Sequence, residues 1–261
     1  MPHSQLLNYQ FHPTKQTINR PTLVFIHGLF GDMNNLGVIA RAFSDDYNIL
    51  RVDLRNHGQS FHSESMDYDL MAEDVFQLIQ HLKLEKVILI GHSMGGKTAM
   101  KLTALHPEWV EKLVVIDIAP IAYGNGGHQD VFEGLFAVKT AAPQNRQAAK
   151  PILEQKIQDP AVVQFMLKSF EPTSPEFFRF NLTALFNNYP HLMDWQNLQV
   201  NTPTLFIKGG NSSYIKPEDS DRIVAQFPNA SSFIINGCGH WVHAEKPDFV
   251  IRAISRFLNK N

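Results

Sequence analysis

Residues 91–98 place a serine among glycines and match two motifs that carry different chemistry. The segment reads Gly-His-Ser-Met-Gly-Gly-Lys-Thr. Gly91-x-Ser93-x-Gly95 is the pattern of a nucleophile elbow, a sharp turn that presents a reactive serine hydroxyl. Gly91 with Gly96-Lys97-Thr98 also fits a phosphate-binding loop, in which backbone N–H groups and the lysine contact a nucleotide. Both motifs need a strand before them and a helix after them, so the rest of the chain must discriminate between them.

Three further features of the chain favour the elbow. Enzymes with this elbow carry serine, acid and histidine in that chain order, and a loop after an early strand supplies a backbone N–H donor. Here Asp117 ends the apolar run after the elbow, His240 follows the last such run, and His27–Gly31 follows an early one. A phosphate-binding loop requires neither the histidine nor the donor loop, although Asp117 could then lie near magnesium. The pattern predicts Ser93 as a nucleophile, with a helix N-cap as the alternative.

Backbone N–H groups are expected to stabilise the oxyanion that forms when Ser93 attacks a carbonyl. The helix after the elbow directs its first N–H groups at this position. We therefore expect the N–H of Met94 to contribute, together with the N–H of Leu29 or, as an alternative, of Phe30. The glycines at 91 and 95 are explained by crowding, since side chains there would collide within the turn.

The base that accepts the serine proton is predicted to be His240. Glycines at 237 and 239 form a turn that can present its ring. His243 is the rival, and its other interpretation is a packing residue that supports His240. A metal site formed by the two histidines is disfavoured, because no cysteine or carboxylate cluster completes it.

The acid that orients His240 is predicted to be Asp117. Many hydrolases of this type place the acid after the next-to-last strand, but the turn Gly209–Tyr214 contains no carboxylate before Glu218. Asp117 has the correct chain order, and a buried carboxylate can fix the working tautomer of an imidazole. Its alternative role is structural, as an acceptor for loop N–H groups. Ser212 or Ser213 could add a polar contact from the place where the acid is missing.

The remaining polar residues near these positions are expected to support the site. His27, Gly28 and His92 border it, and the histidines are interpreted as hydrogen-bond donors that order loops. Lys97 is expected to face solvent or to lie behind the reacting groups, without a catalytic role. In the loop Asp53–Ser60, an Asp53–Arg55 pair is expected to fix the backbone.

Strands and helices must bring these residues to one edge of a sheet. Apolar, β-branched runs bounded by turn signals predict buried parallel strands, at Leu23–His27, Ile49–Asp53, Val87–Gly91, Leu113–Asp117, Thr204–Lys208 and Phe233–Asn236, with an edge strand at Leu6–His12. Helical periodicity lies between most of them, at Leu36–Phe43, Leu70–Leu82, Thr98–Leu105, Asp219–Phe227 and Phe249–Leu258. This alternation predicts an α/β fold with a mostly parallel, doubly wound sheet, whose strand ends carry the proposed site.

One long segment interrupts the alternation. No convincing strand occurs between Asp117 and Thr204, and prolines divide this segment into short helical stretches. It begins with glycines at 124, 126 and 127 and contains eight of the 19 phenylalanines. We predict a helical cap, or lid, over residues 121–199, inserted into a core formed by 1–120 and 200–261. Its phenylalanines either form a small core or line an acyl pocket.

Composition excludes several classes of protein. The chain has 261 residues and a net charge of −2, which gives no support for a nucleic-acid binder. Its single cysteine, Cys238, excludes an internal disulfide framework and a Cys-rich zinc site. No signal peptide and no membrane-spanning run is apparent. We expect a cytoplasmic protein, a monomer or small homo-oligomer, that needs no metal or cofactor.

The motifs together resemble the α/β-hydrolase superfamily, and most closely the YbfF-type esterases, which are related to eukaryotic abhydrolase-domain esterases. The likeness spans essentially the whole chain and is weakest in the cap. It rests on these segments: His27-Gly28-Leu29-Phe30-Gly31, Asp53-Leu54-Arg55-Asn56-His57-Gly58, Gly91–Lys97, Asp117-Ile118-Ala119-Pro120, Gly209–Ser212 and Gly239–Pro247.

This resemblance implies a carboxylester hydrolase that acts on small acyl esters, with acyl-CoA thioesters as a further substrate class. It also implies that the acid follows the strand after the elbow, at Asp117. Runner-up functions are a C–C bond hydrolase or a cofactor-free perhydrolase on the same fold. From other classes, a phosphate-loop nucleotidase using Gly91–Thr98 and a non-catalytic ligand receptor are the alternatives.

Overall fold

Seven strands form one sheet in the computed structural model, which describes residues 5–15, 20–124 and 126–259. Their order is β1-β3-β2-β4-β5-β6-β7, and β1 alone is antiparallel to its neighbour. The strands are β1 (Tyr9–His12), β2 (Thr22–Ile26), β3 (Ile49–Val52), β4 (Val87–His92), β5 (Val110–Ile116), β6 (Thr204–Gly209) and β7 (Ala230–Ile235). The predicted α/β fold and each predicted strand are confirmed, including the edge position of β1.

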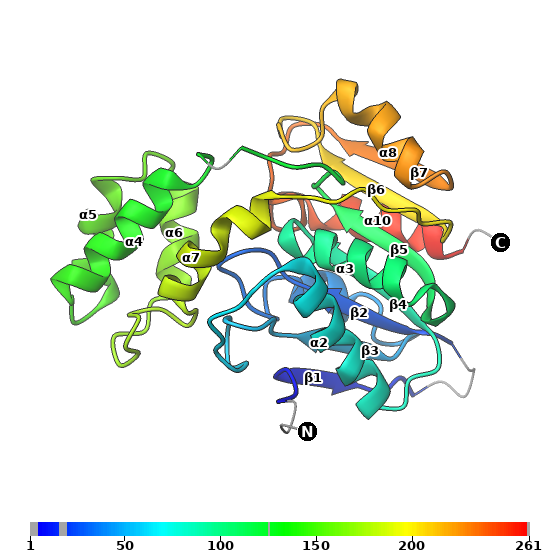
Figure 1. Cartoon of the computed structure of the whole chain (residues 1–261), viewed down its shortest axis with the longest axis horizontal. Coiled ribbons are helices and arrows are strands. Elements are labelled where there is room, and N and C mark those ends of the chain that lie inside the picture. Colours follow the sequence, from blue (N-terminus) through cyan, green and yellow to red (C-terminus); the bar gives the residue numbers. More distant parts are fainter. Residues whose placement is uncertain (1–4, 16–19, 125, 260–261) are drawn as a thin grey trace.

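Helices cover both faces of the sheet (Figure 1). One face packs against α2 (Tyr68–His81), α3 (Met94–Leu105) and α8 (Ser220–Gln226), and the other against α1 (Gly37–Arg41) and α10 (Pro247–Leu258). Side chains alternate between the two cores along each strand, as in β2, where Val24 faces one core and Phe25 the other. Short helices η1 (Pro107–Trp109), η2 (Pro217–Asp219) and α9 (Val242–Glu245) complete this part of the chain.

The helix after the elbow starts earlier than its periodicity predicts. The pattern indicates Thr98, whereas α3 begins at Met94. Gly95 and Gly96 lower the helix propensity of this first turn. A Cβ on Gly95 would lie 2.3 Å from the backbone oxygen of Ile26, so the turn packs too closely on β2 for larger residues. Tertiary packing, not local propensity, therefore determines this helix start.

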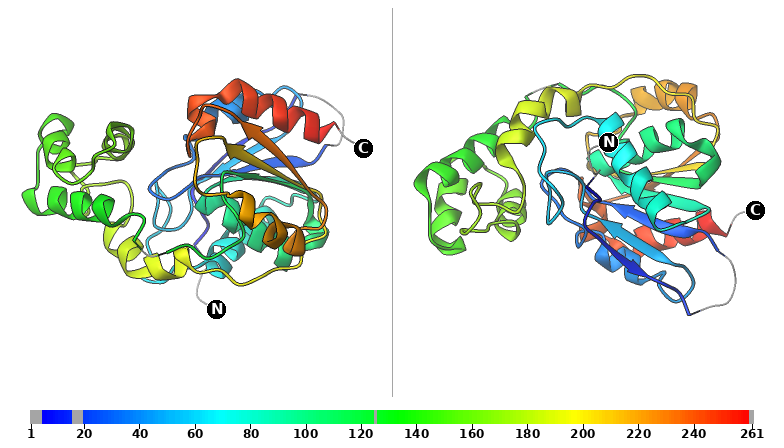
Figure 2. Two further views of the ribbon diagram at one scale, coloured as in Figure 1. Left: turned by 90° about the horizontal axis from the view of Figure 1, so that it is seen from above. Right: turned by 60° about the horizontal axis from the view of Figure 1, so that its bottom comes forward.

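Four helices form between β5 and β6, and we call residues 129–193 the helical insertion. It consists of α4 (Gln129–Ala141), α5 (Arg146–Glu154), α6 (Pro160–Lys168) and α7 (Leu182–Met193). Figures 1 and 2 show these helices as a group beside the sheet, outside its two helical layers. Pro151 and Pro190 lie inside helices rather than between them. The function of this group as a lid stays a prediction.

Register aligns the carboxyl ends of the central strands. Ile26 pairs with Gly91, His92 with Ile116, and Ile116 with Ile207. The residues that follow these strands therefore converge at one edge of the sheet. Among the described residues, no helix is both long and apolar enough to cross a membrane.

Candidate active site

Ser93 lies in a strained turn between β4 and α3. Its backbone has φ 54° and ψ −122°, a conformation that is costly for a residue with a Cβ. A Cβ on Gly91 would lie 2.2 Å from the backbone oxygen of Gly95. The prediction that side chains at the flanking positions would crowd the turn is therefore confirmed.

Ser93, His240 and Asp117 form a chain of hydrogen bonds. Ser93 Oγ lies 3.0 Å from His240 Nε2, and His240 Nδ1 lies 2.7 Å from Asp117 Oδ2. The Nδ1–H must donate to the carboxylate, which leaves Nε2 as the acceptor for the serine proton. The three side chains come from positions up to 147 residues apart. This geometry is that of a general base aimed at a nucleophile.

Asp117 is completely buried, and each of its carboxylate oxygens has partners. Its backbone φ is 54°, which turns the chain sharply at the end of β5. Oδ1 accepts the backbone N–H of Gly209 at 2.9 Å, and Oδ2 accepts the hydroxyl of Ser212 at 2.5 Å. These donors stabilise the ionised carboxylate, since hydrogen bonds to a charged acceptor are stronger than those to a neutral one.

Ser212 therefore occupies the position proposed for an extra polar contact, whereas Ser213 is exposed. Replacing Ser212 with alanine is expected to lower kcat about tenfold without changing KM, because one hydrogen bond to the carboxylate is lost. Steady-state kinetics on a short-chain ester measures this effect. Ser213→Ala is the matched control, and an equal loss in both variants would contradict a specific role for the Ser212 hydroxyl.

The oxyanion site stays a prediction, and the backbone N–H groups of Leu29 and Met94 are its candidates. Met94 is the first residue of α3, where N–H groups lack helical partners. In the described part of the chain, no acceptor lies within bonding distance of the N–H of Leu29 or Met94. The alternative donor, Phe30, is disfavoured, because its N–H donates to Nε2 of His57 at 3.1 Å. Phe30 has φ 65°, so the backbone turns sharply at this residue.

Several histidines around the site are kept neutral by burial. Burial lowers the pKa of His57 and of His243 to about 3, and it lowers the pKa values of His27 and His92. A neutral ring can donate and accept at once: His27 donates to the carbonyl of Gly28 and accepts the N–H of Leu54.

His92 packs against the ring of His240, and His243 packs against His92. His92 Nε2 donates to the backbone oxygen of His240 at 2.9 Å, and so orders the loop that carries it. The rival base, His243, packs against the ring of His92, and its Nδ1 is buried without a partner. The structure therefore brings His240, and not His243, to the serine.

A pocket of about 580 Å³ opens beside Ser93, between the strand ends and the helical insertion. Phe165 of α6 lines it and packs against Trp241, with ring centroids 5.3 Å apart. Other insertion phenylalanines, such as Phe178 and Phe180, are instead buried, and Phe180 packs against Phe30 with ring centroids 5.2 Å apart. Some phenylalanines of the insertion therefore line the pocket, and others are buried in the protein interior.

Sequence reasoning missed His128 and Tyr214, which both line this pocket. The ring of Tyr214 stacks on His240 at a centroid distance of 4.0 Å. Nδ1 of His128 lies 2.6 Å from the hydroxyl of Tyr189, and burial lowers the pKa of His128 to about 4. The glycines immediately before His128 were the available signal, since they mark the turn that brings it to the site.

The predicted Asp53–Arg55 pair is wrong. Arg55 pairs with Asp74, at 2.6 and 2.8 Å, and not with Asp53. Asp53 instead accepts N–H groups from Met33 and Gln59. The helix α2 supplies Asp74, and its position relative to Arg55 depends on tertiary packing.

Of the two positions expected for Lys97, the one facing solvent is wrong and the one behind the reacting groups agrees with the structure, since its side chain is buried. Its ammonium donates to the backbone oxygen of Ile121 at 2.7 Å. A phosphate-binding lysine must instead extend toward a ligand from an open glycine loop. The tight Gly91–Gly95 turn and the direction of Lys97 therefore favour the elbow over the nucleotide-binding alternative.

The parallel sheet, the strained serine turn and the hydrogen-bonded Ser93, His240 and Asp117 together define a hydrolase of the α/β class. Comparison with known proteins agrees: residues 21–247 match the family described by the alpha/beta hydrolase fold. The chain belongs to this family.

Three named relatives of the chain are described as esterases or lipases. The chain is 74% identical to a Haemophilus influenzae protein named provisionally as an esterase/lipase, over 98% of this chain and 89% of that protein. It is 44% identical to Esterase YbfF of Escherichia coli, over 97% and 99% of the two chains. It is also 37% identical to the sn-1-specific diacylglycerol lipase ABHD11 of Mus musculus, over 91% and 81%. The predicted resemblance to the YbfF-type esterases is confirmed, and the protein is an esterase/lipase-type α/β hydrolase.

Proposed function

We propose that this protein is a serine carboxylester hydrolase that acts through an acyl-enzyme. The hydrogen-bond chain from Ser93 through His240 to Asp117 is the observation that supports this proposal most directly. Neither a ligand receptor nor a nucleotide-binding protein needs such a chain, whereas acyl transfer does.

The reaction proceeds in two halves. Ser93 Oγ attacks the ester carbonyl carbon while His240 Nε2 takes its proton, and the oxyanion accepts the N–H groups of Leu29 and Met94. The C–O bond to the alcohol breaks as His240 returns the proton to the leaving oxygen. Water then attacks the acyl-enzyme, gives its proton to His240, and the acid leaves as that proton returns to Ser93. Asp117 stabilises the imidazolium in both halves.

The charge around the pocket supports esters of uncharged alcohols rather than acyl-CoA thioesters. Three carboxylates line it, from Asp130, Asp159 and Glu245, and none of its described lining residues is lysine or arginine. All three are exposed at the opening. Coenzyme A carries several negative charges on its phosphates, which these carboxylates would repel. Neutral lipid or small-molecule esters meet no such repulsion.

Substrates that share one acyl group test this proposal. We expect kcat/KM for phenyl butyrate to exceed that for butyryl-CoA by about tenfold or more at low salt, with a smaller difference at high salt because ions screen the carboxylates. The double variant Asp130→Asn/Asp159→Asn should reduce the ratio of kcat/KM for phenyl butyrate to kcat/KM for butyryl-CoA. Glu111→Gln, at the amino end of β5, is the control. A preference for butyryl-CoA would contradict the ester assignment, and absence of turnover on all butyryl substrates would contradict the hydrolase.

A further inference from the structure

Lys97 places a positive charge inside the protein, one turn after the nucleophile on α3. Its side chain is 1% exposed. The ammonium donates to the carbonyl of Ile121, and it lies 4.7 Å from the ring centroid of Tyr123, 5.1 Å from that of Trp195 and 5.5 Å from that of Tyr68. A carbonyl and three ring faces are the partners that favour a cation in the absence of a carboxylate.

This environment is costly for the charged group. Burial lowers the pKa of Lys97 to about 7, and the attraction of the Asp194 carboxylate opposes that shift. The proposed reaction uses no proton and no hydrogen bond of Lys97. Lys97 takes no part in the proposed reaction and forms no ion pair with the residues that the structure describes, so its burial needs another explanation, which its neighbours provide.

Three of the four partners of Lys97 lie on the two segments that connect the helical insertion to the sheet, and the fourth, Tyr68, begins α2. We call residues 118–124 the first linker and residues 194–198 the second linker. Ile121 and Tyr123 belong to the first linker, and Trp195 belongs to the second. The first linker contacts the last residue of α7, where the N–H of Tyr123 donates to the carbonyl of Met193 at 2.8 Å. Figure 1 shows the two connections leaving the sheet near α3.

The same contacts continue to the catalytic histidine. The hydroxyl of Tyr123 accepts the N–H of Ala119 at 3.0 Å and donates to the carbonyl of Tyr214 at 2.5 Å. The ring of Tyr214 covers His240. A small cavity of about 30 Å³ is bounded by Lys97, Tyr123, Tyr214 and Ser93, so the ammonium and the nucleophile border the same space.

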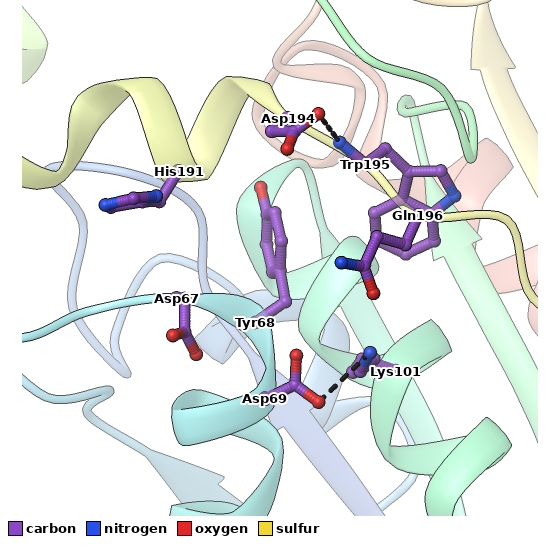
Figure 3. Close-up of a pocket in the computed structure, with 8 residues that line it drawn as sticks. All are labelled: Asp67, Tyr68, Asp69, Lys101, His191, Asp194, Trp195 and Gln196. Atoms are coloured by element: carbon purple, nitrogen blue, oxygen red, sulfur yellow. Dashed lines mark hydrogen bonds and ion pairs between the residues drawn. The ribbon is translucent and has the colours of Figure 1, made fainter.

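Tyr68 and Trp195 lie between the Lys97 ammonium and the protein surface. They line a separate groove of about 170 Å³ at the surface, shown in Figure 3. In that groove Lys101, on the next turn of α3, forms an ion pair with Asp69 at 3.0 Å. Two lysines of one helix thus have opposite surroundings, which gives a matched pair for experiment.

We propose that Lys97 is a positioning residue for ester hydrolysis. Its ammonium attaches both linkers to the nucleophile helix, and so sets the position of Tyr214 at the wall of the large pocket and of the helical insertion over that pocket. This inference rests on the proposed esterase function. It predicts a larger effect on substrates that extend under the insertion than on those that fill only the space beside Ser93.

The test compares Lys97→Met with Lys101→Met on p-nitrophenyl acetate and p-nitrophenyl decanoate. Methionine keeps a similar length but has no charge and no donor. We expect Lys97→Met to raise KM for the decanoate at least tenfold, while kcat for the acetate stays within threefold of the wild type. Lys101→Met should leave all four constants unchanged. Fluorophosphonate titration of active sites corrects each value for the fraction of folded enzyme.

A second variant covers the case in which Lys97→Met does not fold. Tyr123→Phe keeps the ring beside the ammonium but removes the hydroxyl that bridges Ala119 and Tyr214, and it should show the same KM effect in smaller degree. Unchanged KM values for both esters, or an equal loss on both, would overturn the positioning role. A wild type that neither hydrolyses these esters nor reacts with the fluorophosphonate would instead overturn the proposed function.

Discussion

Replacing Ser93 with alanine is expected to lower kcat for ester hydrolysis by about 10⁴- to 10⁶-fold, the range seen when serine hydrolases lose their nucleophile. The variant retains the N–H groups of Leu29 and Met94, which still stabilise an oxyanion formed by attack of water. It cannot form the acyl-enzyme, because alanine has no oxygen for the carbonyl carbon. The residual rate therefore measures the contribution of the oxyanion site and of substrate binding.

Two measurements check this result. Steady-state turnover of p-nitrophenyl butyrate gives kcat, and mass spectrometry after fluorophosphonate treatment gives the labelled residue. The wild type should gain one adduct on Ser93, and the alanine variant should gain none while its circular dichroism spectrum is unchanged. An adduct on another serine, or turnover within tenfold of the wild type, would show that Ser93 is not the nucleophile.

Replacing Asp117 with asparagine should lower kcat by about 10⁴-fold, the size of the effect of this change in other triads. The asparagine amide has nearly the same shape, so the fold should tolerate it. However, the fixed N–H of Gly209 keeps the amide oxygen at the Oδ1 position, so the NH₂ group would face both Nδ1 of His240 and the hydroxyl of Ser212. The favoured tautomer then has the proton on Nε2, where it cannot receive another from Ser93.

The control for this variant is Glu218→Gln. Glu218 is the first carboxylate after the turn in which many related enzymes carry their acid, and it is exposed. We expect this variant to retain full activity. Near-complete activity of Asp117→Asn, or a large loss in Glu218→Gln, would move the acid from the end of β5 to the segment after β6.

The sequence was sufficient to predict the fold and the candidate triad because both follow from local patterns and chain order. Buried parallel strands are continuous apolar runs, so the runs Leu23–His27 and Leu113–Asp117 indicated β2 and β5, although β5 begins three residues earlier, at Val110. Parallel strands place their carboxyl ends at one edge, so polar residues after separate strands had to converge there. The distances from His240 to Ser93 and Asp117 agree with that reasoning.

The remaining features depend on contacts between distant parts of the chain. His57 removes Phe30 from the candidate oxyanion donors, and Asp74 takes the place of Asp53 beside Arg55. In each case two residues of a suitable type could form the same hydrogen bond or ion pair. Only the packing of separate elements decides which of the two does so. The environment of Lys97 was hidden for the same reason, since its partners come from α2 and from both linkers.

The backbone at the ends of β2, β4 and β5 has a consequence for thermal inactivation. Phe30, Ser93 and Asp117 all have positive φ, and the strands before them are neighbours in the sheet. Conformations of this kind cost about 1–3 kcal/mol each, so the packed sheet must supply the energy that keeps three strained turns in register. A small loss of packing in the sheet would allow these three turns to relax while most helices stay folded. We therefore expect heating to abolish catalytic activity at a temperature below that at which the chain unfolds.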